Sequence, residues 1–438
     1  MRNSILICAA LGLVAGVWNC DSIWSSSVVD CGRPGFKCPD GYTPPGQDLS
    51  MSDSDGGGGG GPDGGGSGSD MGQNIPAGYS SVFVQSDSAR TTLVGTSDGR
   101  VRTYASTGTG TLVLAGQLTE LAGTPIVGIW RGTFGGTGSP IDYTIVVPNA
   151  NKFYTHINTS PGVPQDTSRI LNAIWSRRRN GNNNEQIYST TKMYLAANGG
   201  RVIEFDVQLS PGPTLSALTD RDLQVASNIH AVGGLQSAGG LDTNRMCMPM
   251  PCANTDVVWA AGDGGKLFNR NDAGWHEITN VIGTVPSSAR FFGIASVRTT
   301  PSAAPQAFAV GQDGVFVERP SGDASQWQTA ASPPFGTKTM NAICFFDDNE
   351  AWAVGDGGAI YHYLTYDGPP MWIPVTLGSL GKDLSTVSLR AVHCSERFDD
   401  GMVTARDRRV TIVGSNNTLF YGEDSSQMGI NYTWKLVE

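Results

Sequence analysis

The segment AWAVGDGGAIY (351–361) decides the fold of this chain, because six related segments accompany it. Each is a short hydrophobic run that ends in small residues, breaks at an Asn, Asp or Gly turn and resumes as an alternating strand. The other six are TTLVGTSDGRVRTY (91–104), YTIVVPNANKFYTH (143–156), MYLAANGGRVIEF (193–205), VVWAAGDGGKLF (257–268), AFAVGQDGVFV (307–317) and VTIVGSNNTLFY (410–421). Equivalent positions of successive segments lie 44 to 65 residues apart, a spacing typical of four-stranded propeller blades.

Two further kinds of strand flank these segments. An element that pairs small with aliphatic residues precedes each one, as in NAICF (341–345) and RAVHC (390–394), and is predicted to be an innermost strand A. A strand with Trp near its start follows the last four as strand D, as in WKLV (434–437). The Asn/Asp/Gly dipeptides then form the B–C hairpin turns. We predict an all-β fold over residues 79–438, a seven-bladed β-propeller of four-stranded antiparallel blades, closed by packing of blade 1 against blade 7.

The composition and charge of the 438-residue chain agree with many short strands and exclude one class of partner. Its 58 glycines, 24 prolines and 16% charged residues are typical of strands joined by tight turns. The formal net charge is −10 and the pI is about 5.0. Because phosphate recognition requires clustered Lys and Arg, we expect no nucleic-acid partner.

The N-terminus has the organisation of an export signal followed by a tether. Arg2 precedes an apolar run over 5–17 that is too short to span a bilayer but long enough for a signal-peptide core. We assign 1–19 to a signal peptide, 20–50 to a Cys-containing segment and 51–78 to a Gly/Ser/Asp-rich flexible linker. A tether of this kind suits a folded head attached to a membrane or wall.

Two positions compete for the end of the signal peptide. Small residues at 14–16 suit an ordinary signal peptidase, whereas Cys20 would be the acylated first residue of a lipoprotein, although residues 17–19 depart from the usual lipobox. Once Cys8 leaves with the signal peptide, seven cysteines remain, and acylation of Cys20 leaves six that can pair. The cysteine count therefore favours a lipid-anchored protein of the bacterial cell envelope, with secretion to the extracellular space as the alternative.

The six other cysteines fall into three pairs. Cys31–Cys38 and Cys247–Cys252 are each predicted to close a short loop by a disulfide in an oxidising compartment. A zinc knuckle at Cys31 and Cys38 is the alternative, but no His precedes position 156 to complete it.

The third pair, Cys344–Cys394, follows from an offset in the repeat. His393 of blade 7 occupies the place that Cys344 has in blade 6, so Cys394 lies one residue further on. Because strand side chains alternate between faces, this offset points the two thiols toward one another across neighbouring blades. We predict a disulfide between blades 6 and 7, with two buried free thiols as the alternative.

The repeats that end in AWAVGDGGAIYHY (351–363), together with the strand-D tryptophans, resemble those of BNR (Asp-box) propellers. The pattern is similar to the photosystem II stability/assembly-factor-like propellers of exported bacterial proteins, fairly over 257–438 and faintly over 79–256. The full Asp box, Ser-x-Asp-x-Gly-x-x-Trp, occurs here in shortened or scrambled versions, which are NRNDAGW (269–275), SGDASQW (321–327) and YDGPPMW (366–372). The box is a structural fold-back in that family, so the resemblance implies a fold rather than an activity.

A secreted carbohydrate-active enzyme is the alternative function, because sialidases and other glycosidases use related blades. A sialidase-like site needs three arginines from different blades, and Arg131, Arg245 and Arg390 are candidates without the usual Phe/Tyr-Arg-Ile-Pro signature. The carboxylate pairs at 347–348 and 399–400 lie in predicted loops, where Asp is first of all a turn former. We therefore predict no catalytic residues.

We also predict no metal site and no cofactor. Aspartates at the B–C turns suit tight hairpins, and the histidines lie in separate strands without a ligand partner at close spacing. These residues are Asp98, Asp263, Asp313 and Asp356, and His156, His230, His276, His362 and His393.

Recognition is predicted on the face of the ring that carries the A–B loops. The B–C turns are short in all seven repeats, whereas A–B connections are long at 176–190, 234–255 and 395–409. For the tryptophans near these loops, the alternative role is packing in the core. For the basic stretch at 176–186, the alternative is an ordinary solvated loop. The candidate binding residues are Trp130, Trp175, Arg177, Arg178, Arg179, Arg408 and Arg409. We predict a monomeric, non-enzymatic binding or scaffold module for a protein or glycan.

Overall fold

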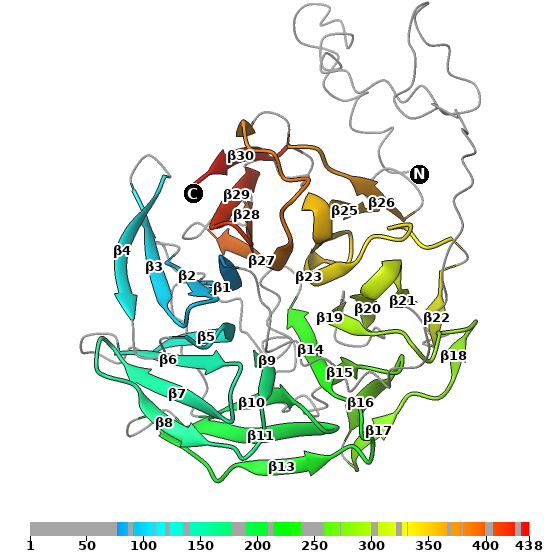
Figure 1. The fold of residues 1–438 in the computed structure, drawn as a ribbon, viewed down its shortest axis with the longest axis horizontal. Helices are drawn as coiled ribbons and strands as arrows, with labels where there is room; N and C mark the ends of the chain where they lie inside the picture. The colour runs from blue at the N-terminus through cyan, green and yellow to red at the C-terminus, as the bar shows by residue number, and fades with distance from the viewer. Residues whose placement is uncertain are drawn as a thin grey trace, which may run out of the picture. The chain divides into compact units, whose positions relative to one another are not determined.

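A computed structural model of the chain describes residues 77–437 apart from a set of short gaps. These gaps are 86–90, 108–110, 119–122, 135–140, 177–189, 209–212, 238–257, 272, 299–304, 321–325, 331, 366–369, 378–379, 399–405 and 425–430. The described strands form seven antiparallel blades around a central axis, as predicted (Figure 1). No helix in these ranges is long and apolar enough to cross a membrane.

The first three blades use strands β1 to β13. Blade 1 consists of β1 (Tyr79–Val84), β2 (Thr92–Thr96), β3 (Val101–Ser106) and β4 (Leu112–Leu118). Blade 2 consists of β5 (Ile126–Phe134), β6 (Ile141–Pro148), β7 (Lys152–Ile157) and β8 (Val163–Asp166). Blade 3 consists of β9 (Leu171–Ser176), β10 (Thr190–Ala197), β11 (Arg201–Gln208), and two short outer strands, β12 (Thr214–Leu215) and β13 (Thr219–Asp222).

The other four blades follow the same order. Blade 4 consists of β14 (Ile229–Ser237), β15 (Val258–Gly262), β16 (Leu267–Asn271) and β17 (Gly274–Glu277). Blade 5 consists of β19 (Phe291–Arg298), β20 (Gln306–Gly311), β21 (Phe316–Arg319) and β22 (Trp327–Thr329), with β18 (Val281–Ile282) paired to β22. Blade 6 consists of β23 (Met340–Asp347), β24 (Glu350–Gly355), β25 (Ile360–Leu364) and β26 (Met371–Pro374). Blade 7 consists of β27 (Leu389–Phe398), β28 (Arg406–Gly414), β29 (Thr418–Asp424) and β30 (Thr433–Leu436).

The innermost strands share a β-bulge after their first residue, which leaves the second residue unpaired in the ladder. Three polar side chains at this second position, those of Ser80, Asn172 and Asn341, bind the first backbone carbonyl of the next blade. Asn172 Nδ2 donates to the carbonyl of Ile229 at 2.7 Å, and Asn341 Nδ2 donates to that of Leu389 at 2.9 Å. The bulged residues therefore connect successive blades around the axis.

Small residues in the innermost strands allow the blades to approach one another. A Cβ on Gly128 would lie 2.6 Å from Cγ2 of Ile174 in the next blade, and one on Gly233 would lie 2.2 Å from the carbonyl oxygen of Ile294. Both distances are shorter than a carbon contact allows, so these positions require glycine. The small–aliphatic pattern in the sequence thus reports the crowding of strands at the axis.

Blades 4 and 5 are joined more closely than the repeat predicts. The ends of β14 and β19 pair in parallel from Leu235↔Ser296 to Ser237↔Arg298, which merges the two blades into one nine-stranded sheet. The four-strand pattern of each blade is kept, and the extra pairing lies at the A–B ends of the two innermost strands.

The ring closes by packing of blade 1 against blade 7, as predicted. Asn416 N donates to the carbonyl of Ala77 at 2.9 Å, and Gly78 forms a bridge with Ser415. A buried cluster spans the seam and contains Tyr79, Val94, Tyr104, Leu112, Val413, Leu419 and Tyr421. No strand of blade 1 pairs with a strand of blade 7 within the described residues, so apolar packing holds the seam.

The turn aspartates act as structural residues. Asp263 Oδ1 accepts a hydrogen bond from His230 Nε2 at 2.7 Å and lies 3.4 Å from Arg290 Nε. Asp356 Oδ1 accepts hydrogen bonds from Asn341 Nδ2 at 2.9 Å and from Ser388 Oγ at 2.6 Å. These side chains fasten the B–C turns to the following blade.

An ion pair joins blades 3 and 4 through Glu204 in β11, whose side chain is almost fully buried. Its Oε1 accepts hydrogen bonds from Arg270 Nε at 2.9 Å and from Trp275 Nε1 at 2.8 Å, and Arg221 Nε lies 3.5 Å from Oε2. Burial raises the pKa of this carboxyl, but the hydrogen bonds and the two guanidinium charges outweigh burial and lower the pKa below 4.5.

We expect Glu204 to make the fold sensitive to acid. Because its pKa is lowered in the folded state, its contribution is fully present above the unfolded pKa of about 4.3 and is lost as the pH falls through the folded pKa. Urea unfolding of the wild type and of Glu204→Gln between about pH 7 and about pH 3 measures this loss. The wild type should lose more stability on acidification than the variant. Glu277→Gln, which removes an exposed pair with Lys266, is the control, and identical pH curves for wild type and Glu204→Gln would contradict the assignment.

Candidate binding site

The two candidate tryptophans pack between blades and form no exposed platform. Trp130 in β5 is 7% exposed and belongs to the core shared by blades 1 to 3. Trp175 in β9 is partly buried, and its ring centroid lies 5.8 Å from that of Tyr194. A Cβ on Gly234 of the next blade would lie 2.2 Å from the Trp175 ring. The alternative role in core packing therefore describes both residues.

The expectation that 395–409 is a long A–B connection that carries the candidate binding residues Arg408 and Arg409 is wrong. Strand β27 continues to Phe398 and β28 begins at Arg406, so both arginines belong to β28. They are 2% and 1% exposed. Arg409 Nε donates to Glu423 at 3.0 Å, and its guanidinium lies 4.8 Å from the centre of the Tyr421 ring. Burial beside a carboxylate places these charges inside the blade, where no ligand reaches them.

Several predicted sites lie outside the described residues. These are Arg177, Arg178, Arg179 and Arg245, the acylation site Cys20, and the cysteine pairs Cys31–Cys38 and Cys247–Cys252.

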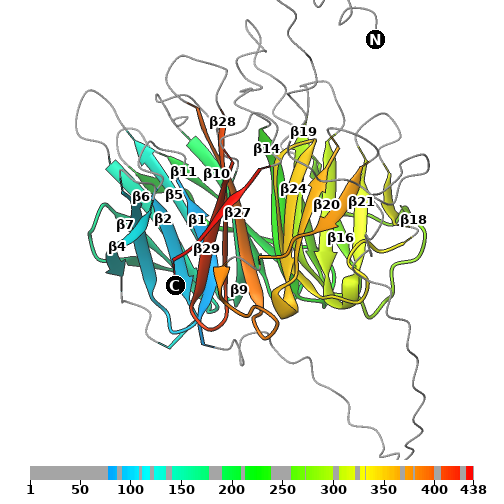
Figure 2. The same ribbon diagram turned by 90° about the horizontal axis from the view of Figure 1, so that it is seen from above.

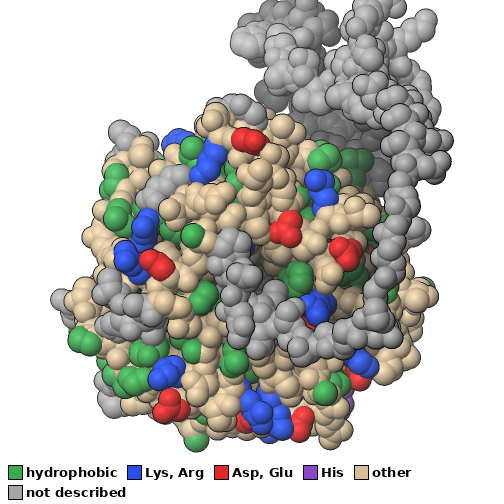
Figure 3. All heavy atoms as spheres, viewed as in Figure 1, with side chains coloured by type: hydrophobic (Ala, Val, Ile, Leu, Met, Phe, Trp, Pro, Cys, Tyr) green, Lys and Arg blue, Asp and Glu red, His purple; other side chains and the backbone are tan. Residues whose placement is uncertain are grey.

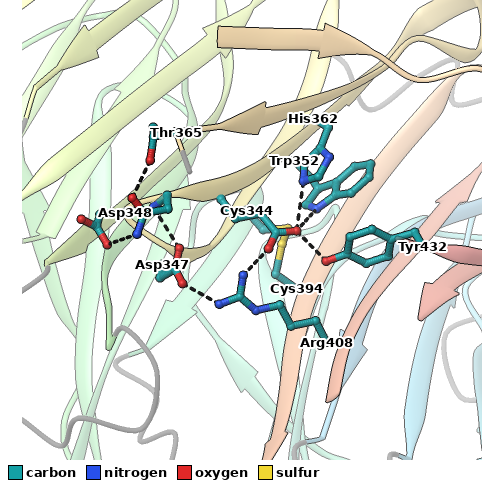
Figure 4. Close-up of polar contacts among 11 residues, drawn as sticks. Cys344, Asp347, Asp348, Trp352, His362, Thr365, Cys394, Arg408 and Tyr432 are labelled. Atoms are coloured by element: carbon teal, nitrogen blue, oxygen red, sulfur yellow. Dashed lines mark hydrogen bonds and ion pairs between the residues drawn. A yellow bond between two sulfur atoms is a disulfide. The ribbon is translucent and has the colours of Figure 1, made fainter. Parts of the chain in front are cut away.

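The disulfide between blades 6 and 7 is present as predicted. Cys344 in β23 and Cys394 in β27 are bonded with an S–S distance of 2.01 Å and a Cα–Cα distance of 5.7 Å (Figure 4). Both residues belong to the buried cluster between the two blades. The one-residue offset in the repeat was sufficient to identify this pair.

A buried polar cluster, centred on Glu350 of β24, lies close to this disulfide (Figure 4). Glu350 has no solvent exposure. Its Oε1 accepts hydrogen bonds from Trp352 Nε1 at 3.1 Å, His362 Nε2 at 3.0 Å and the Tyr432 hydroxyl at 2.5 Å. Its Oε2 pairs with Nη1 of Arg408. We call these five residues, together with Asp347, the Glu350 cluster.

Arg408 bridges two carboxylates from blade 6. In addition to Glu350, it contacts Asp347 through Nη2 at 2.5 Å, and its guanidinium lies 5.2 Å from the centre of the Phe346 ring. Burial raises the pKa of Tyr432 well above 10, and the neighbouring Glu350 charge raises it further. The other side chains of the cluster are buried, and Tyr432 is partly buried. The cluster connects blade 6 to blade 7 through Arg408.

An open pocket of about 630 Å³ lies between the outer strands of blades 5 and 6. The turn after Asp347 connects it to the Glu350 cluster, because Asp348, Asn349 and Thr365 line the pocket. Asn349 N donates to Asp347 Oδ1 at 2.9 Å, and the Thr365 hydroxyl donates to Asn349 Oδ1 at 2.5 Å (Figure 4). The rigid interior thus fixes one edge of the pocket.

Two carboxylates and an aromatic wall set the chemistry of this pocket. Asp348 and Glu318 face it together with Phe316, Tyr363 and Trp372. Burial raises the pKa of Asp348, and the Asp347 charge raises it further. Burial also raises the pKa of Tyr363 to about 12; a hydrogen bond with Gln306 lowers it, and the charges of Glu318 and Asp348 add to the increase. The pocket thus has two carboxylates and no Lys or Arg among its lining residues.

The arginines proposed for a sialidase-like site do not gather at one mouth of the ring. Arg131 lies past the middle of β5, towards the A–B end, and pairs with Asp142 of its own blade. Arg390 is the second residue of β27, at the B–C end, close to the charge of Asp356. The described ranges also contain no cluster of His, Cys, Asp and Glu able to hold a metal ion.

Comparisons with known proteins identify no family. No family model matches the chain, and no curated protein matches it. One solved structure that resembles it is described as YCF48 bound to D1 peptide. It is 9% identical, with a TM-score of 0.48, over 82% of this chain and 94% of that one. The propeller fold is established by the strand order of the chain itself, and BNR repeats are not identified by these comparisons.

Proposed function

We propose that this chain is an exported, lipid-anchored β-propeller that binds a protein at the cell envelope as a non-enzymatic module. The observation that carries the proposal is the difference between the two faces of the ring. All seven B–C turns are short and several are fastened by side chains, whereas among the A–B connections those after β9 and β14 are the longest. Recognition usually lies in long connections on a rigid scaffold.

The place where the chain enters the ring also supports recognition on the A–B face. Residues 77 and 78 contact the B–C turn of blade 7, at Ser415 and Asn416. A tether formed by the preceding residues would leave the ring from the B–C face. An anchored propeller would then turn its A–B face away from the attachment point and toward a partner.

Export is supported by the disulfide and by the N-terminal sequence. Disulfides persist in oxidising compartments such as the periplasm or the cell surface, and Cys344–Cys394 is buried where reductants have little access. A protein is favoured over a glycan because the two tryptophans that suggested a sugar platform pack inside the core. A scaffold role is favoured over catalysis because the buried carboxylates at Glu204 and Glu350 are each paired with arginine. Lys, Arg, Asp and Glu side chains also lie scattered over the face viewed in Figure 3, without a single basic patch.

The proposal predicts acylation at Cys20 and a partner on one face only. Metabolic labelling with a fatty acid should mark the wild type and not Cys20→Ala, and fractionation should move the variant out of the membrane. In the same cells, a photo-crosslinking residue at Ile141, which is 38% exposed at the A–B end of β6, should yield a protein adduct. The same residue at Asn151, in the B–C turn of blade 2, is the matched control. A wild type without fatty-acid label would refute lipid anchoring at Cys20. Equal adducts from both positions would refute recognition on the A–B face.

A further inference from the structure

The pocket between blades 5 and 6 contains two carboxylates that no cation neutralises. Asn349 Nδ2 donates to Asp348 Oδ1 at 3.2 Å, and Gln328 Nε2 donates to Glu318 Oε1 at 2.9 Å. Both donors are neutral amides, and neither carboxylate forms an ion pair within the described residues. Three other carboxylates of the chain, those of Glu204, Glu350 and Asp263, are also buried or half-buried. Each of them has an arginine or histidine partner. The pocket is the exception to this pattern.

This unpaired state is unfavourable for the free protein. Asp348 is partly removed from water and lies next to the Asp347 charge, and both effects raise its pKa. Arg408, which pairs with the adjacent Asp347, also pairs with Glu350. Among the described residues no Lys or Arg pairs with Asp348 or Glu318, so a cation that enters the pocket would gain the attraction of both carboxylates.

The other walls of the pocket indicate what must accompany the cation. Phe316 and Trp372 line the pocket, and aromatic rings bind ammonium and guanidinium groups favourably. Pro320, Pro334 and Pro370 form rigid apolar parts of the rim, and Met371, which is 47% exposed, leaves one side open to solvent. The volume exceeds that of one basic side chain. The open side and the apolar rim suit an extended chain that carries apolar residues beside its charge.

We infer that this pocket binds a Lys or Arg side chain, flanked by apolar residues, in a peptide segment of a protein partner. The inference rests on the proposed function as a protein-binding module and names the chemistry of one contact. Asp348 and Glu318 hold the cationic head, Trp372 and Phe316 pack on its stem, and the proline rim contacts the flanking residues. Tyr363, which accepts a hydrogen bond from Gln306 Nε2 at 3.0 Å, lines the pocket near both carboxylates, whose charges raise its pKa.

The test uses the full chain labelled with ¹⁵N at the tryptophan indoles. The indole signal of Trp372 is assigned by its loss in Trp372→Phe. The probe is the peptide acetyl-Ala-Leu-Lys-Leu-Ala-amide, and the same peptide with acetyl-lysine is the neutral control. The charged peptide should shift the Trp372 signal saturably and the acetylated one should not. No shift with the charged peptide, or equal shifts with both, would overturn the inference.

Variants and pH separate a binding role from a structural one. Asp348→Asn should weaken binding of the charged peptide by about tenfold to a hundredfold, whereas Asp383→Asn, at an exposed carboxylate elsewhere, should not. Binding to the wild type should weaken as the pH falls through the raised pKa of Asp348, and this dependence should diminish in Asp348→Asn. Butylammonium should bind much more weakly than the peptide, and equal affinity would overturn the peptide assignment. If the peptide did not bind as expected but the fatty-acid labelling at Cys20 and the cross-linking from Ile141 succeeded, only the assignment of this pocket would be refuted. The proposed function would stand.

Discussion

Replacement of Arg408 by alanine is expected to lower the free energy of unfolding by about 3–5 kcal/mol. The variant would leave Glu350, which has no solvent exposure, and Asp347, which is 6% exposed, without their shared cation. Removing one partner of a buried ion pair costs more than the pair itself contributes, because the remaining charge stays desolvated. Urea unfolding followed by fluorescence, with the slope compared between variants, measures the loss.

Two variants define the controls for this experiment. Arg100→Ala removes an exposed ion pair with Asp98, in which both side chains are about half exposed, and should cost less than about 1 kcal/mol. Arg408→Lys keeps the charge but cannot contact Asp347 and Glu350 with two separate nitrogens. Its free energy of unfolding should therefore lie between those of the wild type and Arg408→Ala. If Arg408→Ala were no less stable than Arg100→Ala, the Glu350 cluster would not hold the two blades together.

Loss of the Cys344–Cys394 disulfide is expected to cost about 2–4 kcal/mol. The bond closes a stretch with a sequence separation of 50 residues, and in the chain-entropy model a cross-link stabilises by restricting the unfolded chain. The double variant Cys344→Ser, Cys394→Ser should therefore unfold at lower urea concentration than the wild type under non-reducing conditions.

A reductant provides the internal control for the disulfide. Dithiothreitol should lower the unfolding midpoint of the wild type more than that of the double variant, in which only the predicted Cys31–Cys38 and Cys247–Cys252 bonds remain to be reduced. Thiol alkylation of the denatured protein without reductant should leave both residues unmodified. Alkylation of Cys344 and Cys394 under those conditions would show two free thiols and would contradict the bond.

Local sequence patterns were enough to predict the architecture of the ring. Asn, Asp or Gly residues, as in Gly355-Asp356, recur at every B–C hairpin. They could be recognised because the geometry of a hairpin depends on a few adjacent residues. The disulfide could be predicted for the same reason, since alternation along a strand fixes which face each cysteine occupies. The sheet-merging contact of β14 with β19 could not, because it depends on how far two strands from different repeats extend.

The candidate site was less accessible to sequence reasoning. Arg408 was assigned to the A–B connection 395–409 by its place in the repeat, but its partner Glu350 lies 58 residues earlier in the neighbouring repeat. A signal was available, because Arg409 is the repeat equivalent of Glu350 and Arg408 lies one residue before it. An offset of one residue puts two side chains on opposite faces of their own blades, as it does for Cys344 and Cys394. The pocket carries no comparable signal, since its walls come from separate segments of two blades.

The way in which the ring closes determines how an anchored propeller would respond to tension. A pull on the residues before 77 acts along β1, because the innermost strands run roughly parallel to the ring axis (Figure 2). That direction loads the β1–β2 hydrogen bonds together in shear and strains the apolar seam with blade 7. The Cys344–Cys394 bond joins blades 6 and 7 and does not cross this seam. Blade 1 is therefore the mechanical weak point, and its detachment would leave the disulfide and the blade 5–6 pocket intact.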